Sequence, residues 1–527
     1  MKRICSLTLM ALMVMGAFAS AHAATEVKMT GDANIYGSYF SGRNFTGWNR
    51  LGKATEDNFE IWERFRLRTD FVASEAVKFR FGVKVEDTWG HGTYTAANPT
   101  AGISAASGSN VSSGVQVYLA YLQFKWPDCD VQITAGLQPI SLPQSAMFNN
   151  SPVFSDNMAA LTISAPIIPD TLSVLAGFGR LIDSDQTFDN AAYSINGNNT
   201  LRQHQADEVD AYFLALPVTV DGFKATPWGM LSVVGRDGAI ASASLKNTTD
   251  ITSEGNVFAN GLVSGATAMG GYAGLLNGRH QMGHWNNSQN AYYWVGGAFE
   301  VTAADPIRFY ADVIYGAGAT TDSKSAKREG WFVDAGVEYT GLDMVTPQVF
   351  AWWSTGEDKS TGNGSERMPY VRSKWGPGNS FLFDSSQEFG KGGSMNVSPV
   401  GNYGIGASLN NMSFIEKLTH RLTFMYVRGN NSARALRLSN ISSGTFATGS
   451  SSYSYVYMGR DLTENESLYG LSFDTKYMIY ENLAAILEAG WAHGNFQESV
   501  WGYRQYHHAD DLGDNVWKLA VGLSYKF

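Results

Sequence analysis

One short stretch of the sequence places a positive charge at every second residue. In WERFRLRTD, residues 62–70, Arg64, Arg66 and Arg68 alternate with two apolar side chains. Successive side chains of a β-strand point to opposite faces, so the three guanidinium groups share one face if this stretch is a strand. A row of cations that lines a confined aqueous space biases which ions pass through it.

The strand expected next carries cations at the same spacing. Lys78, Arg80 and Lys84 would share the inner face with the three arginines, and the acids Asp70 and Glu86 lie on the same two strands. Two interpretations therefore stay open. Either the cations form a basic stripe that selects ions, or they are structural cations that neighbouring acids neutralise.

The motifs of enzymes and metal sites are almost absent. Residues 47–53 match G-x-x-x-x-G-K, but Ala54 stands where a phosphate-binding loop has Ser or Thr, so we attribute the match to chance. His280 and His284 lack the glutamate of a zinc-protease helix, and no G-x-S-x-G occurs. The last predicted loop holds five residues that either bind a cation or form a solvated polar loop: His507, His508, Asp510, Asp511 and Asp514. We expect no catalytic residue, no cofactor and no metal.

The charged stretch belongs to a pattern that runs through the whole chain. In residues 515–527, large apolar side chains alternate with small or charged ones, and the chain ends on Phe527. Full charges occur in the middle of the polar faces, which indicates water on that side. Eighteen strands of this kind are predicted, or sixteen if one hairpin is lost: 27–40, 58–73, 77–88, 114–126, 129–138, 157–166, 171–180, 207–216, 222–235, 290–303, 306–318, 330–340, 345–355, 400–411, 418–430, 466–478, 482–493 and 515–527.

The connections between these strands alternate in length. Tight turns such as 74–76 and 303–305 alternate with long segments rich in Gly, Ser, Asn and Thr, such as 236–289 and 356–399. Short turns on the periplasmic side and long loops on the extracellular side are typical of outer-membrane barrels. The pattern therefore predicts an all-β fold, a transmembrane antiparallel β-barrel.

The N-terminus predicts export. Residues 1–23 contain Lys2 and Arg3, an apolar run, and the small-residue motif A-H-A at 21–23, which together indicate a cleaved secretory signal peptide. No domain boundary is apparent in the remaining chain. We therefore expect residues 24–527 to form a single barrel domain.

Composition excludes several classes of protein. Without the two signal-peptide cations, 36 Lys and Arg stand against 48 Asp and Glu, a formal charge of −12, which argues against a nucleic-acid partner. Cys129 is the only cysteine of the mature chain, so no intrachain disulfide and no cysteine zinc site is expected. After the signal peptide no apolar run reaches the ~20 residues of a spanning helix.

A membrane sheet cannot leave backbone hydrogen bonds open to lipid, so it must close on itself. The last strand is therefore expected to pair with the first, residues 27–39. In that first strand Met29 and Ile35 would face lipid, whereas Asp32 and Asn34 would face the lumen. A barrel of this strand number leaves an aqueous lumen.

The signal peptide, the opening TGDANIYGSYF, the ending YKF and the alternating loop lengths resemble the general diffusion porins of Gram-negative outer membranes. The resemblance is greatest to the homotrimeric porins of Desulfovibrio-type sulphate-reducing bacteria and covers the whole mature chain. It implies a water-filled homotrimer surrounded by outer-membrane lipid and lipopolysaccharide. It also implies that the barrel-assembly machinery reads the C-terminal strand, here through Tyr525 and Phe527.

The resemblance further implies that the loop after the fifth strand, residues 139–156, folds inward and narrows the pore. General porins carry several carboxylates on this loop, whereas this chain has only Asp156. Other acids lie partly in long loops, where salt limits their reach to ~8 Å. A weak anion preference is therefore expected, and its sources would be five lumen cations: Arg64, Arg66, Arg68, Arg80 and Lys84.

The sequence thus predicts an outer-membrane porin, a passive channel for small hydrophilic solutes and ions. A substrate-specific channel is the first alternative, although most tyrosines and tryptophans fall at lipid-facing or girdle positions. An outer-membrane barrel enzyme is the second. It would need an inward Ser–His pair, and His420 is the one histidine expected outside the signal peptide, loops and turns. A secreted soluble β-protein is the non-membrane alternative.

Overall fold

The structure is a computed structural model that describes residues 25–41, 45, 58–89, 115–182, 208–235, 289–321, 324, 327–360, 363–378, 380–383, 389, 394–395, 397–434, 459–501 and 515–527. The predicted signal peptide, residues 1–23, lies outside these residues. So do the G-x-x-x-x-G-K match and the histidine and acidic candidates between 279 and 284 and between 507 and 514.

Eighteen long antiparallel strands form the barrel wall within these ranges, which confirms the predicted number: β1 (Glu26–Ser41), β2 (Asn58–Ser74), β3 (Val77–Thr88), β4 (Gln116–Lys125), β5 (Gln132–Ser141), β7 (Ser155–Ile168), β8 (Leu172–Ile182), β9 (Val209–Ala215), β11 (Phe223–Gly235), β12 (Gln289–Val301), β13 (Ile307–Gly318), β14 (Arg328–Tyr339), β15 (Thr346–Ser354), β17 (Asn402–Ile415), β18 (Leu418–Gly429), β19 (Ser467–Tyr480), β20 (Leu483–Asn495) and β21 (Asn515–Lys526). Four short elements accompany them: β6 (Phe148–Asn149), β10 (Val218–Val220), β16 (Gly376–Pro377) and α5 (Glu498–Trp501).

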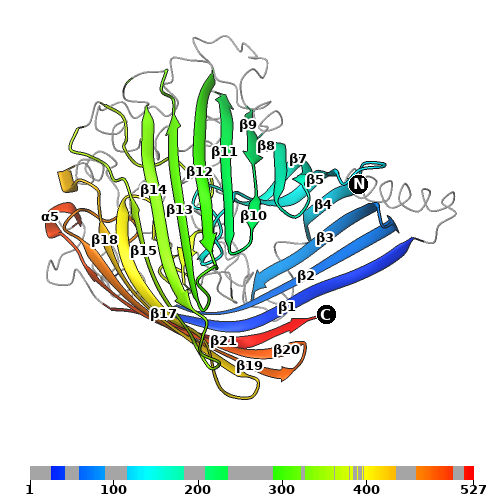
Figure 1. The fold of residues 1–527 in the computed structure, drawn as a ribbon. Coiled ribbons are helices and arrows are strands. Elements are labelled where there is room, and N and C mark those ends of the chain that lie inside the picture. The colour runs from blue at the N-terminus through cyan, green and yellow to red at the C-terminus, as the bar shows by residue number, and fades with distance from the viewer. Residues whose placement is uncertain are drawn as a thin grey trace, which may run out of the picture.

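The last strand closes the sheet onto the first, as predicted. β21 pairs antiparallel with β1 from Asp32↔Lys526 to Ser41↔Trp517 and with β20 on its other side, so red β21 lies next to blue β1 in Figure 1. Phe527 extends this pairing, because its N–H donates to the Gly31 carbonyl at 3.1 Å and its carbonyl accepts from the Gly31 N–H at 2.8 Å. A Cβ atom at Gly31 would overlap the Phe527 ring and lie 2.5 Å from the Arg66 carbonyl oxygen, so the close approach requires glycine.

The two faces of the wall have opposite polarity. On β21 the outward side chains are large and between 39% and 54% exposed: Trp517, Leu519, Val521, Leu523 and Tyr525. The inward side chains alternate with these, and Val516 and Lys518 are at most 4% exposed. An apolar outer face around a polar interior suits lipid outside and water inside. The protein is therefore a β-barrel of the outer membrane.

The two ends of the barrel differ in their connections. At one end, which we call the short-turn end, strands are joined by tight turns such as 75–76, 169–171 and 481–482. We call the opposite end, from which the long connections leave, the long-loop end. In the described part of the chain, no helix is long and apolar enough to cross a membrane.

Strand boundaries follow the predicted segments, with small differences. The largest is at β17, which continues to Ile415 rather than ending at residue 411. The segment expected to be a constriction loop, 139–156, is shorter in the structure, because β5 continues to Ser141 and β7 begins at Ser155. Asp156 is therefore a strand residue rather than a loop residue.

Phe527 provides a test of barrel closure. Deleting it removes two backbone hydrogen bonds to Gly31 and the stacking of its ring on Phe65 and Tyr525. We expect the amount of folded protein in the outer membrane to fall at least several-fold, measured by surface labelling and by heat-modifiable gel mobility. The control is Phe414→Ala, which removes a lipid-facing ring that is 68% exposed. Equal levels of the two variants would contradict the closure argument.

Candidate functional site

The three arginines of β2 gather on the inner wall around a single carboxylate. Arg66 Nε lies 3.0 Å from each oxygen of Asp32, and Arg68 Nη2 lies 3.2 Å from Oδ1. Arg64 Nη2 is 3.6 Å from Asp32 Oδ2. The register explains this arrangement, because Asp32 of β1 lies directly opposite Arg66 and the other two arginines are two residues away on the same face.

The remaining predicted cations have partners of their own. Arg80 donates to both oxygens of Asp70, at 2.5 and 2.6 Å, and Lys84 lies 3.5 Å from Glu86. In these two pairs one acid neutralises one cation, as expected if the cations are structural. The arginines of β2 differ, since three of them share Asp32. These five cations and the three acids that pair with them carry a formal charge of +2.

This basic part of the wall is accessible from the lumen. The side chains of Arg64, Arg66 and Arg68 are 19%, 34% and 37% exposed, whereas the Asp32 side chain is 6% exposed. The cations therefore meet the solvent while the acid that they share lies beneath them. We call the inner face of β1–β3 around these residues the basic wall.

Two connections of the long-loop end fold into the lumen. They are residues 142–154, between β5 and β7, and the described part of 355–401, between β15 and β17. We call them the inward loops. They pair with each other where Phe148–Asn149 (β6) meets Gly376–Pro377 (β16).

The inward loops pack an aromatic cluster against the wall. Trp375 lies 5.0 Å from Phe332 of β14 and 5.6 Å from Trp352 of β15, measured between ring centroids, and is 1% exposed. Phe148 and Phe383 complete the cluster on either side of Trp375. Burial of several large aromatic side chains is a strong driving force for packing, so the loops are held inside the barrel rather than above it.

This cluster adds inward aromatic side chains that were not singled out in the sequence. Trp228, Trp294 and Trp352 face inward and are at most 4% exposed. A signal for the inward packing was present in the sequence. Phe381, Leu382 and Phe383 form an apolar run inside a connection otherwise rich in Gly and Ser.

The inward loops also reach the strands near the chain ends. Phe389 stacks on Tyr36 of β1 with ring centroids 4.3 Å apart, and its N–H donates to Glu488 of β20 at 3.3 Å. Glu488 forms an ion pair of 2.8 Å with Lys518, and both side chains are 2% exposed. Loop residues thus cover the charges of β20 and β21, whereas the basic wall of β1–β3 stays open.

Two further acids of the wall are covered in the same way. Asp312 and Asp334 lie opposite each other on β13 and β14. The Ser145 N–H donates to Asp312 Oδ1 at 2.8 Å and the Ser145 hydroxyl donates to Oδ2. Gln144 Nε2 and Trp375 Nε1 donate to Asp334 Oδ2 at 2.9 and 2.8 Å. These carboxyl groups anchor both inward loops and are 1% exposed, so a passing solute does not meet them.

Asp156 has two cationic partners outside the basic wall. Arg372 Nε lies 2.5 Å and Lys374 Nζ 3.6 Å from its carboxylate oxygens, so two cations share this acid as well. Asp156 was predicted to be the acid that faces the basic stripe, and these two partners were not predicted. They lie in a different long connection, more than two hundred residues along the chain, and nothing in their spacing indicates the contact.

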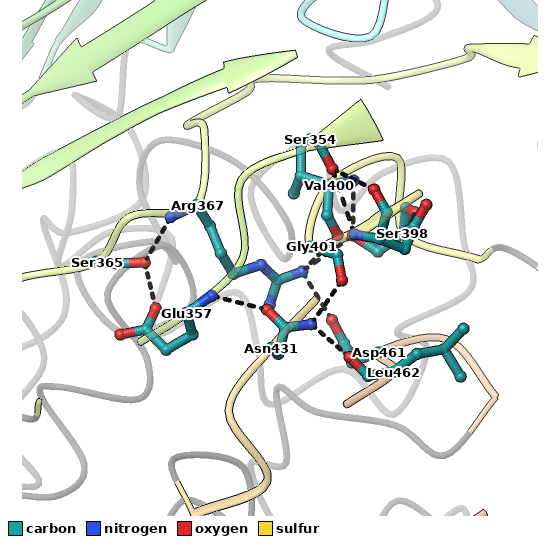
Figure 2. A network of polar contacts seen from close by, with 11 residues as sticks. Ser354, Glu357, Ser365, Arg367, Ser398, Val400, Gly401, Asn431, Asp461 and Leu462 are labelled. Atoms are coloured by element: carbon teal, nitrogen blue, oxygen red, sulfur yellow. Dashed lines mark hydrogen bonds and ion pairs between the residues drawn. The ribbon is translucent and has the colours of Figure 1, made fainter. Parts of the chain in front are cut away.

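A polar network ties the larger inward loop to its neighbours (Figure 2). Arg367 Nη2 donates to the Asp461 carboxylate at 2.8 Å, to the Ser398 hydroxyl at 3.0 Å and to the Val400 carbonyl at 3.4 Å. Asp461 is 2% exposed. A buried guanidinium that binds a carboxylate and two further acceptors is costly to break, because separation leaves a buried charge unpaired.

Asn431 and Glu357 extend this network. Asn431 Nδ2 donates to the carbonyls of Gly401 at 3.0 Å and Leu462 at 2.7 Å, and its Oδ1 accepts from the Glu357 N–H at 3.0 Å. Glu357 accepts from the Ser365 hydroxyl at 2.5 Å. Its other oxygen is buried and has no hydrogen-bond partner within the described ranges. Burial raises the pKa of Glu357 to about 8.

A cavity of about 260 Å³ lies beside the basic wall. Hydroxyl and amide groups from several strands line it, among them Tyr121, Gln123, Thr134 and Gln138. Tyr121 connects the cavity to the basic wall, because the Arg80 guanidinium carbon lies 5.9 Å from the centre of its ring. The cavity is large enough for a small polar solute and offers hydrogen-bonding groups without a fixed charge of its own.

Two histidines lie in the described strands, His420 in β18 and His493 in β20, whereas only His420 was expected on a strand. His420 shares a face of β18 with Leu422, stacks on Phe473 and contacts Thr475 through Nδ1. Among the described residues, no group of three or more His, Cys, Asp or Glu side chains is arranged to bind a metal ion.

Comparison with known proteins adds similar structures but no relative in sequence. No protein family and no curated protein sequence matches the chain. The structure is similar to that of outer membrane protein OprD from Pseudomonas aeruginosa, with 12% identity over 96% of each chain and a TM-score of 0.46. It is similar to Pseudomonas aeruginosa OpdQ, with 11% identity over 95% of this chain and 98% of the other, TM-score 0.47. It is also similar to Acinetobacter baumannii OccAB2, with 10% identity over 95% of this chain and 98% of the other and a TM-score of 0.44.

Glu357 makes the packing of the larger inward loop depend on pH. Its pKa in the folded loop lies above the ordinary value of 4.5, so the stability that it contributes is complete at acidic pH and is lost as pH rises through about 8. Glu366 disfavours its ionisation, whereas Arg328 and Arg367 favour it. We expect current fluctuations of a reconstituted single channel to become several-fold more frequent between pH 7 and 9.5.

The Glu357→Gln variant removes the ionisable group at this position and should fluctuate equally at both pH values. The control is Glu464→Gln, which changes an exposed loop acid and should keep the wild-type pH dependence. Fluctuations that do not change with pH in the wild-type channel would contradict this role of Glu357.

Proposed function

We propose that this outer-membrane barrel is a substrate-selective channel for small anionic hydrophilic solutes, which cross it by passive diffusion. The observation that carries the proposal is the charge of the accessible wall. The inward loops cover the buried acids of β13, β14 and β20, while the arginines of β2 remain exposed around one shared acid.

The packing of the inward loops favours a selective channel over a wide general diffusion porin. In a general porin one loop narrows an otherwise open lumen. Here two loops pair with each other and bury an aromatic cluster against β12–β15, so solute is confined to the side of the lumen that carries the basic wall. In a narrow passage with low-dielectric walls each fixed charge acts more strongly on a solute.

The cavity beside the basic wall supports a substrate with polar groups as well as a charge. Gln123 and Gln132 offer both donors and acceptors there. Such a lining suits hydroxyl or amide groups of a small solute. The anionic group of the same solute would face the arginines, and its polar body would face this cavity.

Charge selection is tested by the reversal potential of a reconstituted channel in a salt gradient. We expect the wild type to prefer chloride over potassium. The Arg64→Gln, Arg66→Gln, Arg68→Gln triple variant removes three positive charges and leaves Asp32, so we expect the preference to be lost or reversed. A wild type that prefers cations would contradict the proposal.

A charge-neutral control separates the basic wall from charge in general. Arg80→Gln combined with Asp70→Asn removes an ion pair on the neighbouring strands without changing the net charge. We expect its reversal potential to stay close to that of the wild type. If this double variant lost selectivity as fully as the triple variant, the arginines of β2 would not be its main source.

We also propose that the channel is a homotrimer, as the resemblance of the sequence to homotrimeric porins implies. Closed cyclic symmetry lets identical barrels lie side by side in one membrane. Light scattering of the protein in mild detergent, corrected for bound detergent, is expected to give three copies per particle. A single copy under the same conditions would contradict this proposal.

A further inference from the structure

The basic wall holds more hydrogen-bond donors than its acceptors use. Each guanidinium carries five N–H groups, whereas a carboxylate offers about four acceptor positions. Asp32 receives one donor from Arg66 and one from Arg68 at hydrogen-bond distance. The Nε atoms of Arg64 and Arg68 are buried and have no acceptor among the described residues.

Arg64 has one acceptor other than Asp32. When the Asn34 amide is oriented with its oxygen toward Arg64, that oxygen accepts from Arg64 Nη2 at 2.8 Å. Arg68 has no comparable second acceptor within the described ranges and is the most exposed of the three arginines. The donor surplus is therefore concentrated at Arg66 and Arg68, toward the lumen.

Tyr118 adds a further unused donor at the same place. β4 contains a bulge there, because Gly82 pairs with Leu119 but the next residue, Val83, pairs with Val117. The bulge turns the Tyr118 ring over Gly82, where an added Cβ atom would lie 3.1 Å from the ring. Gly82 in turn lies opposite Arg68 in the sheet.

The Tyr118 hydroxyl is buried and has no hydrogen-bond partner in the part of the chain that is described. It interacts electrostatically with Arg68 and Arg66, and more weakly with Asp32 and Arg80. An unpaired buried hydroxyl costs about 1–3 kcal/mol. The unpaired Tyr118 hydroxyl thus lies beside guanidinium groups that also have unused donors. Together these donors indicate a binding site for a group that supplies acceptors.

We propose that Arg66, Arg68 and Tyr118 form a saturable binding site for an oxyanion, the group shared by carboxylates and phosphates. This inference rests on the proposed function and deepens it, because it assigns binding to a particular group of donors. A halide offers one acceptor centre, whereas an oxyanion presents several oxygens that a guanidinium contacts in pairs. Only an oxyanion uses the surplus donors of two arginines and a hydroxyl together.

Access to the site is open on the lumen side. Arg68 is 37% exposed and is held by one hydrogen bond of 3.2 Å, so its guanidinium can move toward the lumen at small cost. A movement of Arg68 changes the surroundings of the buried Tyr118 hydroxyl, because the two groups interact electrostatically. An anion that contacts Arg66 and Arg68 from the lumen then accepts from the hydroxyl as well.

The test measures block of the chloride current through a reconstituted channel by inorganic phosphate and, separately, by acetate at constant ionic strength. We expect a saturable fall in current for at least one of them in the wild type. Tyr118→Phe should raise the half-blocking concentration about tenfold, the effect of losing one hydrogen bond to a charged group. Its reversal potential in potassium chloride should stay unchanged, because no charge is removed.

The matched control is Tyr310→Phe, since the Tyr310 hydroxyl already donates to Glu338 Oε1 at 2.7 Å on another part of the wall. The anions should block the Tyr310→Phe channel at the same half-blocking concentration as the wild-type channel. Block by both anions identifies the shared oxyanion chemistry, and block by one of them identifies its source. Two results would contradict the oxyanion site but leave the proposed function standing. One is an anion-selective channel whose current shows no saturable block, and the other is a Tyr118→Phe channel with the half-blocking concentration of the wild type. A cation-selective wild type instead overturns the proposed function.

Discussion

Backbone hydrogen bonding in a medium without water is the constraint on which the rest of this structure depends. A strand exposed to lipid cannot leave its N–H and C=O groups unpaired, so the sheet has to close. Here closure depends on β21 and β1, and the chain ends on the strand that completes the ring. The pairing of Phe527 with Gly31 extends the closure to the last residue. Every feature of the lumen depends on this ring, because the ring sets which side chains face one another.

Closure creates an interior that the chain then partly fills. The inward loops remain inside because they bury aromatic side chains and because the wall provides acceptors for them. Asp312 and Asp334 receive four hydrogen bonds from Gln144, Ser145 and Trp375. The same contacts that hold the loops also remove acids from the accessible surface. The packing of the loops therefore also determines which wall charges are exposed to the lumen.

The formal charge of the chain is negative, yet the accessible wall is positive. The difference arises from the position of each charge rather than from its number. Glu488 is paired and covered, and Asp461 is paired with Arg367. The arginines of β2 share one acid and face the solvent. A solute responds to the charges that it can approach, since buried ion pairs present little net field to the lumen.

The sequence by itself determined the strands, their faces and their closure. Alternation with a period of two residues places Trp517 outside and Lys518 inside without any tertiary information, because the pleat of a strand enforces it. The row of Arg64, Arg66 and Arg68 was predicted for the same reason. Only the tertiary structure determined which acids pair with them, since register places Asp32 opposite Arg66. It also determined that Arg372 and Lys374 meet Asp156, and that Tyr118 turns inward at a bulge. Contacts between loops distant in the chain have no local period, so no pattern of spacing encodes them.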